Sequence, residues 1–276
     1  MRHLPGVAAL LPLYDVFLLD QYGTLHDGVR PYPGVLDALR AVRDAGKRVA
    51  LLSNSGKRGA DNLRRLDRMG IPAALFDVAM TSGEAAHTLL AAGSVAAARG
   101  ARRCLLLERD GDGRLLEGLG LVAVAAGAAD LVVIAGSEGE RRPLAAYAEL
   151  LAPQARAGVP ALCLNPDRIM LTPAGPAFGA GRIAELYEEM GGRVTWIGKP
   201  YPAIFALTLA ALGDPPPARV AMLGDSVEHD IAGARAAGCG AWLVRTGIAA
   251  GLDDAAIAAE CRLRGAVPDG VLDACA

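Results

Sequence analysis

Asp20 is the residue whose type and surroundings most directly suggest chemistry. It follows the apolar run Val16–Leu19, and the turn-forming pair Gly23-Thr24 comes shortly after it. A short apolar run bounded by turn residues is typical of a buried strand in a parallel sheet. Ligands of such sheets bind just beyond the carboxyl ends of the strands. At such a strand end, the Asp20 carboxylate would act as a nucleophile or hold a metal ion.

Polar residues also follow three further runs that are predicted to be parallel strands. Because the carboxyl ends of parallel strands meet at one edge of a sheet, we expect these side chains to converge with Asp20. The residues are Ser53, Asn54, Lys199, Asp225 and Asp230.

A carboxylate, a hydroxyl, a lysine and an acidic pair at one crevice suit phosphoryl transfer. The transition state spreads negative charge over the phosphoryl oxygens, so an enzyme must position the group and neutralise that charge. In this interpretation Asp20 attacks phosphorus and forms an aspartyl-phosphate. Ser53 and the amide groups around Asn54 hold the phosphoryl oxygens, and Lys199 neutralises both the nucleophile and the phosphate.

Two further aspartates complete the predicted site. Asp225, together with Asp20, would hold Mg²⁺ through the oxygen ligands that this cation prefers. Asp230 follows Asp225 by five residues, after a tight turn, and would hold metal-bound water.

The order of strand-like and helix-like runs predicts the elements that position these residues. The two kinds of run alternate along the chain, which predicts a parallel sheet with helices on both faces. We expect a Rossmann-like α/β core built from residues 1–78 and 194–276, interrupted by an α/β cap at residues 79–193.

The predicted core strands are 15–20, 48–52, 194–197, 219–223 and 240–244, and the predicted core helices are 34–44, 60–69, 201–212 and 231–237. In the cap, the predicted strands are 103–107, 129–134 and 161–164, and the predicted helices are 144–151, 183–190 and one opened by Thr81 or Ser82.

Composition limits the classes of function. The chain has 276 residues and a formal net charge of −2, which argues against a nucleic-acid or membrane-surface role because both need a basic patch. The five cysteines are scattered and never in CxxC spacing, so we expect a reduced, cytosolic protein without a structural zinc site. The N-terminal stretch lacks a signal-peptide pattern. The apolar run 118–136 is interrupted by Gly120, Gly127 and Asp130, which favours short strands over a membrane span.

The polar segments, in their order and spacing, resemble the four motifs of the haloacid dehalogenase superfamily. The resemblance covers nearly the whole chain. The gap between the first two motifs is too short for a cap domain, whereas the gap between the second and third holds one, as in the class IIA capped hydrolases. The motifs are Asp20-Gln21-Tyr22-Gly23-Thr24, Leu51-Leu52-Ser53-Asn54, Gly198-Lys199-Pro200 and Gly224-Asp225-Ser226-Val227-Glu228-His229-Asp230.

The resemblance implies a Mg²⁺-dependent phosphatase of the sugar-phosphatase or p-nitrophenyl-phosphatase type, acting on a small phosphorylated metabolite. It implies Asp20, the main-chain carbonyl of Tyr22 and Asp225 as metal ligands, with Asp230 in support. Asp20, Tyr22 and Lys199 would be the catalytic residues, and the cap would select the substrate. A cap-mediated homodimer is compatible with the resemblance.

Tyr22 departs from the family pattern. Family phosphatases usually carry a second aspartate at this position, which acts as general acid and then as general base. Loss of general acid–base help typically costs about 10²–10⁴ in rate. A tyrosine, with an ordinary pKa of about 10, is a poor base at neutral pH.

Three interpretations of Tyr22 stay open. In the first, the protein is a phosphatase in which another group moves the proton, and His26 has a suitable ordinary pKa of about 6.5. In the second, Asp20 displaces halide from carbon, as in the metal-independent 2-haloacid dehalogenases; the cap position and the metal-ligating Asp225 argue against it. In the third, the protein has weakened or lost catalysis and binds a phosphorylated ligand or a partner protein, against which the retained charged cluster argues.

Overall fold

The computed structural model describes residues 1–109, 111, 113–172 and 175–276. By their contacts, these residues divide into two compact units. Unit 1 comprises Met1–Ser53, Ala60–Met80 and Lys199–Ala276, and unit 2 comprises Asn54–Gly59 and Thr81–Gly198.

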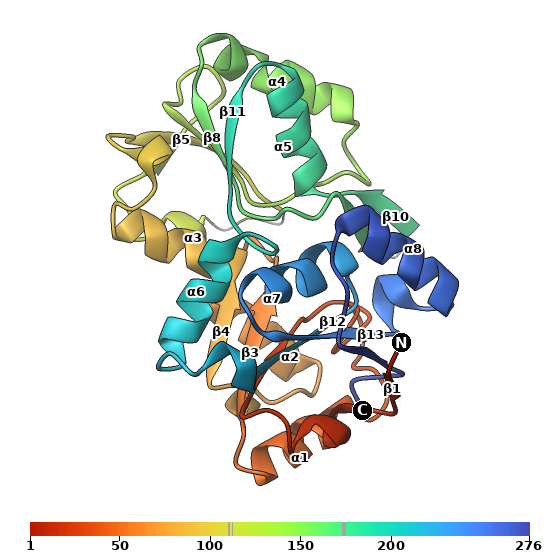
Figure 1. Cartoon of the computed structure of the whole chain (residues 1–276). Helices are drawn as coiled ribbons and strands as arrows, with labels where there is room; N and C mark the ends of the chain where they lie inside the picture. The colour runs from red at the N-terminus through yellow and green to blue at the C-terminus, as the bar shows by residue number, and fades with distance from the viewer. Residues whose placement is uncertain (110, 112, 173–174) are drawn as a thin grey trace. The chain divides into compact units, whose positions relative to one another are not determined.

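Unit 1 is built on a seven-stranded sheet whose neighbouring strands are parallel from β1 to β3 (Figure 1). The strand order is β1 (His3–Leu4), β14 (Gly270–Leu272), β13 (Gly240–Val244), β12 (Val220–Gly224), β2 (Val16–Leu19), β3 (Arg48–Ser53) and β4 (Val78–Thr81). Its helices are α1 (Val35–Asp44), α2 (Gly59–Arg68), α6 (Pro202–Ala211), α7 (Ala232–Ala236) and α8 (Asp254–Arg264).

The central strands of unit 1 are apolar on both faces because helices cover the sheet. Every residue of β2, β12 and β13 is buried. Helix α1 turns Val35, Leu39 and Val42 toward the same core, at the spacing that places residues on one helix face. The prediction of a parallel α/β fold is confirmed.

The register of the sheet brings two candidate carboxylates to one edge. Strands β2 and β12 are neighbours, with Leu19 opposite Leu223. The Asp20 amide continues this pairing by donating to the Leu223 carbonyl at 2.9 Å. Asp20 and Asp225 therefore follow neighbouring strands at their carboxyl ends.

Unit 2 contains a separate five-stranded parallel sheet. Its strand order is β11 (Arg193–Trp196), β8 (Pro160–Cys163), β7 (Leu131–Ile134), β5 (Arg103–Leu107) and β6 (Val122–Ala123). Its helices are α3 (Ser82–Ala91), α4 (Leu144–Arg156) and α5 (Ala180–Glu189), and α4 and α5 lie side by side (Figure 1). Strands β9 (Ile169–Thr172) and β10 (Gly175–Phe178) form an antiparallel pair.

The start of α3 agrees with its sequence signal. The Thr81 hydroxyl accepts a hydrogen bond from the Glu84 amide at 2.9 Å, which satisfies one of the unpaired amides of the first turn. The predicted opening of a helix at Thr81 or Ser82 is confirmed.

The strand predicted at 194–197 does not lie in the core sheet. It is β11, which pairs with β8 in unit 2, and unit 2 continues to Gly198. Residues of β11 alternate between exposed and half-buried, a pattern that fits the edge of either sheet, so only pairing decides its place. Lys199 belongs to unit 1 but follows a strand of unit 2. The division into a catalytic core and a cap stays a prediction about the roles of the two units.

Sequence reasoning also missed helix α8 and the strands β1, β4, β9, β10 and β14. Strands β1 and β14 have two and three residues, too few for a periodic pattern. Within the described residues, none of the helices combines the length and apolar character needed to cross a membrane.

Candidate active site

A buried lysine joins two of the predicted aspartates. Lys199 Nζ donates to Asp20 Oδ1 at 2.5 Å and to Asp230 Oδ1 at 2.7 Å. Lys199 is 2% exposed, and both aspartates are buried. The Ser226 amide donates to Asp230 Oδ2 at 3.0 Å, so both oxygens of Asp230 accept hydrogen bonds from the protein. The geometry therefore makes Asp230 the residue that positions Lys199 beside Asp20.

Asp225 lies in the same cluster but has different partners. Its Oδ2 accepts from the Ile248 amide at 2.7 Å, at the start of the short 3₁₀ helix Gly247–Ala249. One carboxylate oxygen from each of Asp20, Asp225 and Asp230 lies within 4.8 Å of the others. The structure thus brings together four of the residues predicted from sequence.

The cluster carries more negative charge than Lys199 balances. Burial raises the pKa of Asp20 to about 7 against the opposing charge of Lys199, and the Asp230 carboxylate adds to the rise. Burial also raises the pKa of Asp225 well above its ordinary value, and the charges of Asp20 and Asp230 add to that effect. Three carboxylates thus face one ammonium group away from solvent.

This arrangement fits a divalent cation. The donors are carboxylate oxygens, the ligands that Mg²⁺ and Ca²⁺ prefer, and their excess negative charge is the charge that a dication balances. Asp20 and Asp225 are the residues best placed to hold it, because both oxygens of Asp230 are already engaged.

Two glycines let the backbone close around Asp225. A Cβ atom at Gly23 would lie 2.1 Å from Asp225 Oδ2, and a Cβ atom at Gly247 would lie 1.8 Å from the same oxygen. The Thr246 hydroxyl donates to the Gly23 carbonyl at 2.5 Å and ties the two segments together. No side chain larger than hydrogen fits at either position.

Replacing Gly247 with alanine is expected to weaken Mg²⁺ binding by about 10–100-fold, the range typical of disturbed groups around metal ligands. The new methyl group would push the 246–248 segment away and break the bond between the Ile248 amide and Asp225. Isothermal titration with Mg²⁺ measures the effect.

Gly251→Ala is the matched control for this experiment. Gly251 also has a left-handed backbone, with φ of +78°, but a Cβ atom there meets nothing within 4 Å. Both variants carry the backbone strain, about 1–2 kcal/mol, and only Gly247→Ala disturbs Asp225. Equal Mg²⁺ affinities in the two variants would contradict the prediction.

The residues of the predicted second motif fall in different units. Ser53 is buried at the carboxyl end of β3, in unit 1. Asn54 belongs to unit 2, where its Nδ2 donates to Asp167 Oδ1 at 2.8 Å and its Oδ1 accepts from Ser82 Oγ at 3.3 Å. The Asn54 side chain is thus engaged within unit 2.

Two known families match segments of this chain. The haloacid dehalogenase-like hydrolase family matches residues 17–122, and the HAD-hydrolase-like family matches residues 196–274. This chain belongs to the haloacid dehalogenase-like hydrolases. The two matched segments contain Asp20, Lys199, Asp225 and Asp230, so the charged cluster lies wholly within the family's own regions. The resemblance inferred from the motifs is confirmed.

Solved structures of other hydrolases are similar to this chain over most of its length. A haloacid dehalogenase-like hydrolase from Brucella suis 1330 is 25% identical, with a TM-score of 0.86 and 99% of both chains covered. The p-nitrophenyl phosphatase from Archaeoglobus fulgidus is 25% identical, with a TM-score of 0.74 over 95% of this chain and 97% of that one. The glycerol phosphate phosphatase from Mycobacterium tuberculosis, solved with magnesium, is 29% identical, with a TM-score of 0.70 over 87% of this chain and 70% of that one.

Two further protein sequences also match. The 4-nitrophenylphosphatase from Schizosaccharomyces pombe is 33% identical over 66 residues, which are 24% of this chain and only 22% of that enzyme. Haloacid dehalogenase-like hydrolase domain-containing protein 2 from Bos taurus is 28% identical over 232 residues, 83% of each chain.

In this haloacid dehalogenase-like hydrolase, Tyr22 packs against its own loop. Its ring meets the His26 ring edge-on, with centroids 5.6 Å apart. A Cβ atom at Gly28 would lie 2.8 Å from Tyr22 Cε2, so the ring covers a residue that must be glycine. Burial raises the pKa of Tyr22, and nearby Tyr32 adds to this. The phenol is therefore neutral at neutral pH.

His26, the candidate for moving the proton, is enclosed. It is fully buried, its Nδ1 accepts from the Gly28 amide at 2.9 Å, and its Nε2 has no hydrogen-bond partner among the described residues. Burial, and the charge of Arg65, lower the pKa of His26 to about 4. A neutral, enclosed imidazole supports the loop and is poorly placed to exchange protons with substrate.

Sequence reasoning did not single out the segment Thr246–Ile248, which binds both Gly23 and Asp225. The sequence nevertheless contains a signal for this segment. A hydroxyl residue and a glycine follow the predicted strand 240–244, as polar residues follow the other core strands.

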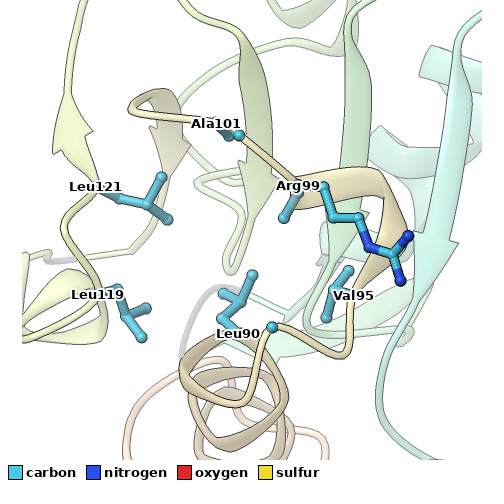
Figure 2. A pocket seen from close by; sticks show the side chains of 9 residues that line it. Leu90, Val95, Arg99, Ala101, Leu119 and Leu121 are labelled. Atoms are coloured by element: carbon cyan, nitrogen blue, oxygen red, sulfur yellow. The ribbon is translucent and has the colours of Figure 1, made fainter.

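Unit 2 also contains a pocket, with a volume of about 250 Å³. Its walls are apolar apart from Arg99, whose guanidinium points away from Leu119 and Leu121 (Figure 2). The pocket offers no carboxylate or hydroxyl side chain, so it does not compete with the aspartate cluster as a place for phosphoryl chemistry.

Proposed function

We propose that this chain is a Mg²⁺-dependent phosphatase that transfers the phosphoryl group of a small phosphorylated metabolite to Asp20 and then to water. The observation that carries the proposal is the contact of Lys199 with Asp20 inside a buried cluster of three carboxylates. The phosphatase names of the relatives from Archaeoglobus fulgidus and Mycobacterium tuberculosis support it. Unit 2 would be the cap that selects the substrate.

The candidate site residues of unit 1 each have a role in this proposal. Asp20 attacks phosphorus, and the ammonium group of Lys199 holds its carboxylate in place and neutralises charge on the phosphoryl oxygens. Asp230 keeps Lys199 in position, and Ser53 binds a phosphoryl oxygen. Asp20, Asp225 and the Tyr22 carbonyl would hold Mg²⁺, with Asp230 in support. When bound, the cation would supply further neutralisation of phosphoryl charge.

Chelation is expected to abolish phosphate release, and added Mg²⁺ is expected to restore it. Without the dication, the carboxylate cluster repels an anionic substrate and favours a protonated, unreactive Asp20. The measurement is phosphate release from a panel of phosphorylated metabolites, with Mg²⁺ and with EDTA.

Asp225→Asn should need higher Mg²⁺ for half-maximal activity in the same assay, because it loses one ligand charge. Chloride release from 2-chloropropionate, run in parallel, tests the dehalogenase alternative. Phosphate release that survives EDTA would contradict the metal requirement, and metal-independent chloride release would favour the dehalogenase. Phosphorylated ligands that bind without turnover would favour the ligand-binding protein.

A further inference from the structure

The first turn of α3 holds the loop that directly follows β3. This loop comprises Asn54–Gly59 and, like α3, belongs to unit 2. The Gly83 amide donates to the Ser55 carbonyl at 3.0 Å, and the Thr81 hydroxyl donates to the Lys57 carbonyl at 2.6 Å. Two carbonyl groups of the loop are thus fixed against the start of the helix, in addition to the bond between the side chains of Ser82 and Asn54.

Glu84, in the same turn, binds the end of the loop. Its Oε2 accepts from Arg58 Nε at 2.8 Å and from the Gly59 amide at 2.9 Å, and its Oε1 accepts from Arg58 Nη2 at 2.9 Å. Two parallel bonds between a guanidinium and a carboxylate are charge-assisted and fix the geometry of both groups. The bond with Arg58 lowers the pKa of Glu84, so the carboxylate is charged at neutral pH.

The loop is in close contact with unit 2 on two sides. A Cβ atom at Gly83 would lie 2.2 Å from the Gly56 carbonyl oxygen, and a Cβ atom at Gly56 would lie 1.9 Å from the Ala135 carbonyl oxygen. The backbone at Gly56 therefore packs against the first turn of α3 and against the residue that follows β7 by one position. A loop held by so many contacts has little freedom to change conformation.

These contacts also determine where an amide of the loop points. A peptide group is planar and trans, so the amide of each residue points away from the carbonyl before it. Because the Ser55 carbonyl faces the Gly83 amide, the Gly56 amide points away from α3. Gly56 is a buried residue, and its amide has no hydrogen-bond partner among the described residues. An unpaired amide in such surroundings is a donor that a bound anion would satisfy.

We propose that Glu84 is a positioning residue of this phosphatase, which holds the loop Asn54–Gly59 so that its main-chain amides meet the phosphoryl group in a fixed geometry. The proposal rests on the proposed phosphatase function, in which Ser53 binds a phosphoryl oxygen, and on the expectation from sequence that the amides around Asn54 do the same. Donors that are fixed in advance stabilise phosphoryl charge without reorganising during the reaction. Glu84 acts through the loop and not on the substrate.

Glu84→Gln tests this role, because it keeps the size of the side chain and removes its charge. We expect kcat/KM for the best substrate of the metabolite panel to fall about 10²-fold, the typical cost of misplacing a group by about 1 Å. The inhibition constant of inorganic phosphate should rise about tenfold, as when one hydrogen bond to a charged group is weakened. Mg²⁺ affinity, measured by isothermal titration without phosphate, should stay unchanged.

The inhibition constant separates positioning from stability, since it does not depend on how much of the enzyme is folded. Glu189→Gln is the matched control. Glu189 accepts two hydrogen bonds from Arg182, at 2.8 and 3.3 Å, on α5 of the same unit. This control breaks an ion pair of the same kind elsewhere and should leave kcat/KM and the inhibition constant unaltered. Equal effects in the two variants would overturn the proposal.

Gly83→Ala tests the same loop from the helix side and keeps the proposal testable if Glu84→Gln does not fold. Its methyl group would displace the Gly56 carbonyl, whereas alanine favours the helix itself more than glycine does. The same rise in the inhibition constant of inorganic phosphate is expected, again with unchanged Mg²⁺ affinity.

The possible outcomes distinguish the positioning role from the phosphatase function. An unchanged inhibition constant in folded Glu84→Gln or Gly83→Ala would overturn the positioning role and leave the phosphatase function intact. Failure of both variants to fold would make the contact purely structural and would also overturn the proposal. Phosphate release from no member of the panel by the unmodified enzyme, with Mg²⁺ present, would instead remove the phosphatase function itself.

Discussion

Asp20→Asn is expected to lower phosphate release on the order of 10⁴–10⁶-fold, the scale seen when a nucleophile is removed from an enzyme. An amide keeps the shape of the side chain and still accepts a hydrogen bond from Lys199, but it does not form an aspartyl-phosphate. The same substitution should leave the free energy of unfolding unchanged or increase it. Burial raises the pKa of Asp20 to about 7, which shows that the folded protein disfavours the charged carboxylate.

Two readouts separate these effects. Phosphate release with Mg²⁺ reports the chemistry, and thermal unfolding in EDTA reports stability without the contribution of bound cation. Mass spectrometry of the peptide containing Asp20, after acid quenching, should find a phosphorylated form in the unmodified enzyme and none in the variant.

Asp15→Asn is the matched control. The Asp15 carboxylate lies on the surface, five positions before the nucleophile, and pairs with Arg219 and Lys47. Its replacement should leave turnover unaltered. An Asp20→Asn variant with full activity would falsify the covalent mechanism.

Lys199→Met is expected to destabilise unit 1 by about 3–5 kcal/mol, the usual cost of removing one partner from a buried ion pair. The variant leaves three buried carboxylates with no ammonium group among them. Part of the cost would be avoided by protonation of Asp20 and Asp225, so the loss should grow as the pH rises and these groups ionise.

The double variant Lys199→Met, Asp230→Asn tests the cause. If the cost comes from unpaired charge, removing one carboxylate should restore a large part of the stability, and the two substitutions should be strongly non-additive. An additive result would assign the loss to packing of the lysine stem and contradict the electrostatic explanation.

The two tryptophans allow unit 1 to be followed alone. Trp242 is buried in the core of unit 1, and Trp196 belongs to β11 of unit 2. In a Trp196→Phe background, fluorescence during urea unfolding reports the unit that contains Lys199. This separation matters because a chain with two units need not unfold in one step.

The chemistry of the site was predictable from sequence because it lies at strand ends. Asp20 and Asp225 each follow an apolar run, and a parallel sheet brings such positions together whatever the loops do. Lys199 was also predicted to be a site residue, although the prediction wrongly placed the strand before it in the core sheet. Its preceding strand belongs to the other sheet, and residue type and spacing do not reveal which sheet an edge strand joins.

The support of the site was less predictable. The bond of the Ile248 amide to Asp225, and that of Thr246 to Gly23, depend on a turn that closes over the cluster. Residue types hardly reveal such backbone contacts, except through the glycine that permits the close approach to Asp225. For His26, the sequence suggested a role in proton transfer that the structure argues against. Its ordinary pKa suggested a proton carrier, and only burial, a tertiary property, showed the enclosure that argues against that role.

The segment Asn54–Gly59 sets a constraint on exchanging modules between related enzymes. Although it directly follows β3, it is held in unit 2 by bonds from Asn54 to Asp167, from Arg58 and the Gly59 amide to Glu84, and from Thr81 to the Lys57 carbonyl. A chimera that takes only residues 81–198 from a relative would place the recipient's own segment 54–59 against residues of the donor. If segments 54–59 and 81–198 are both taken from the same donor, in two separate exchanges in one recipient, those hydrogen bonds are preserved and the donor's unit 2 stays complete.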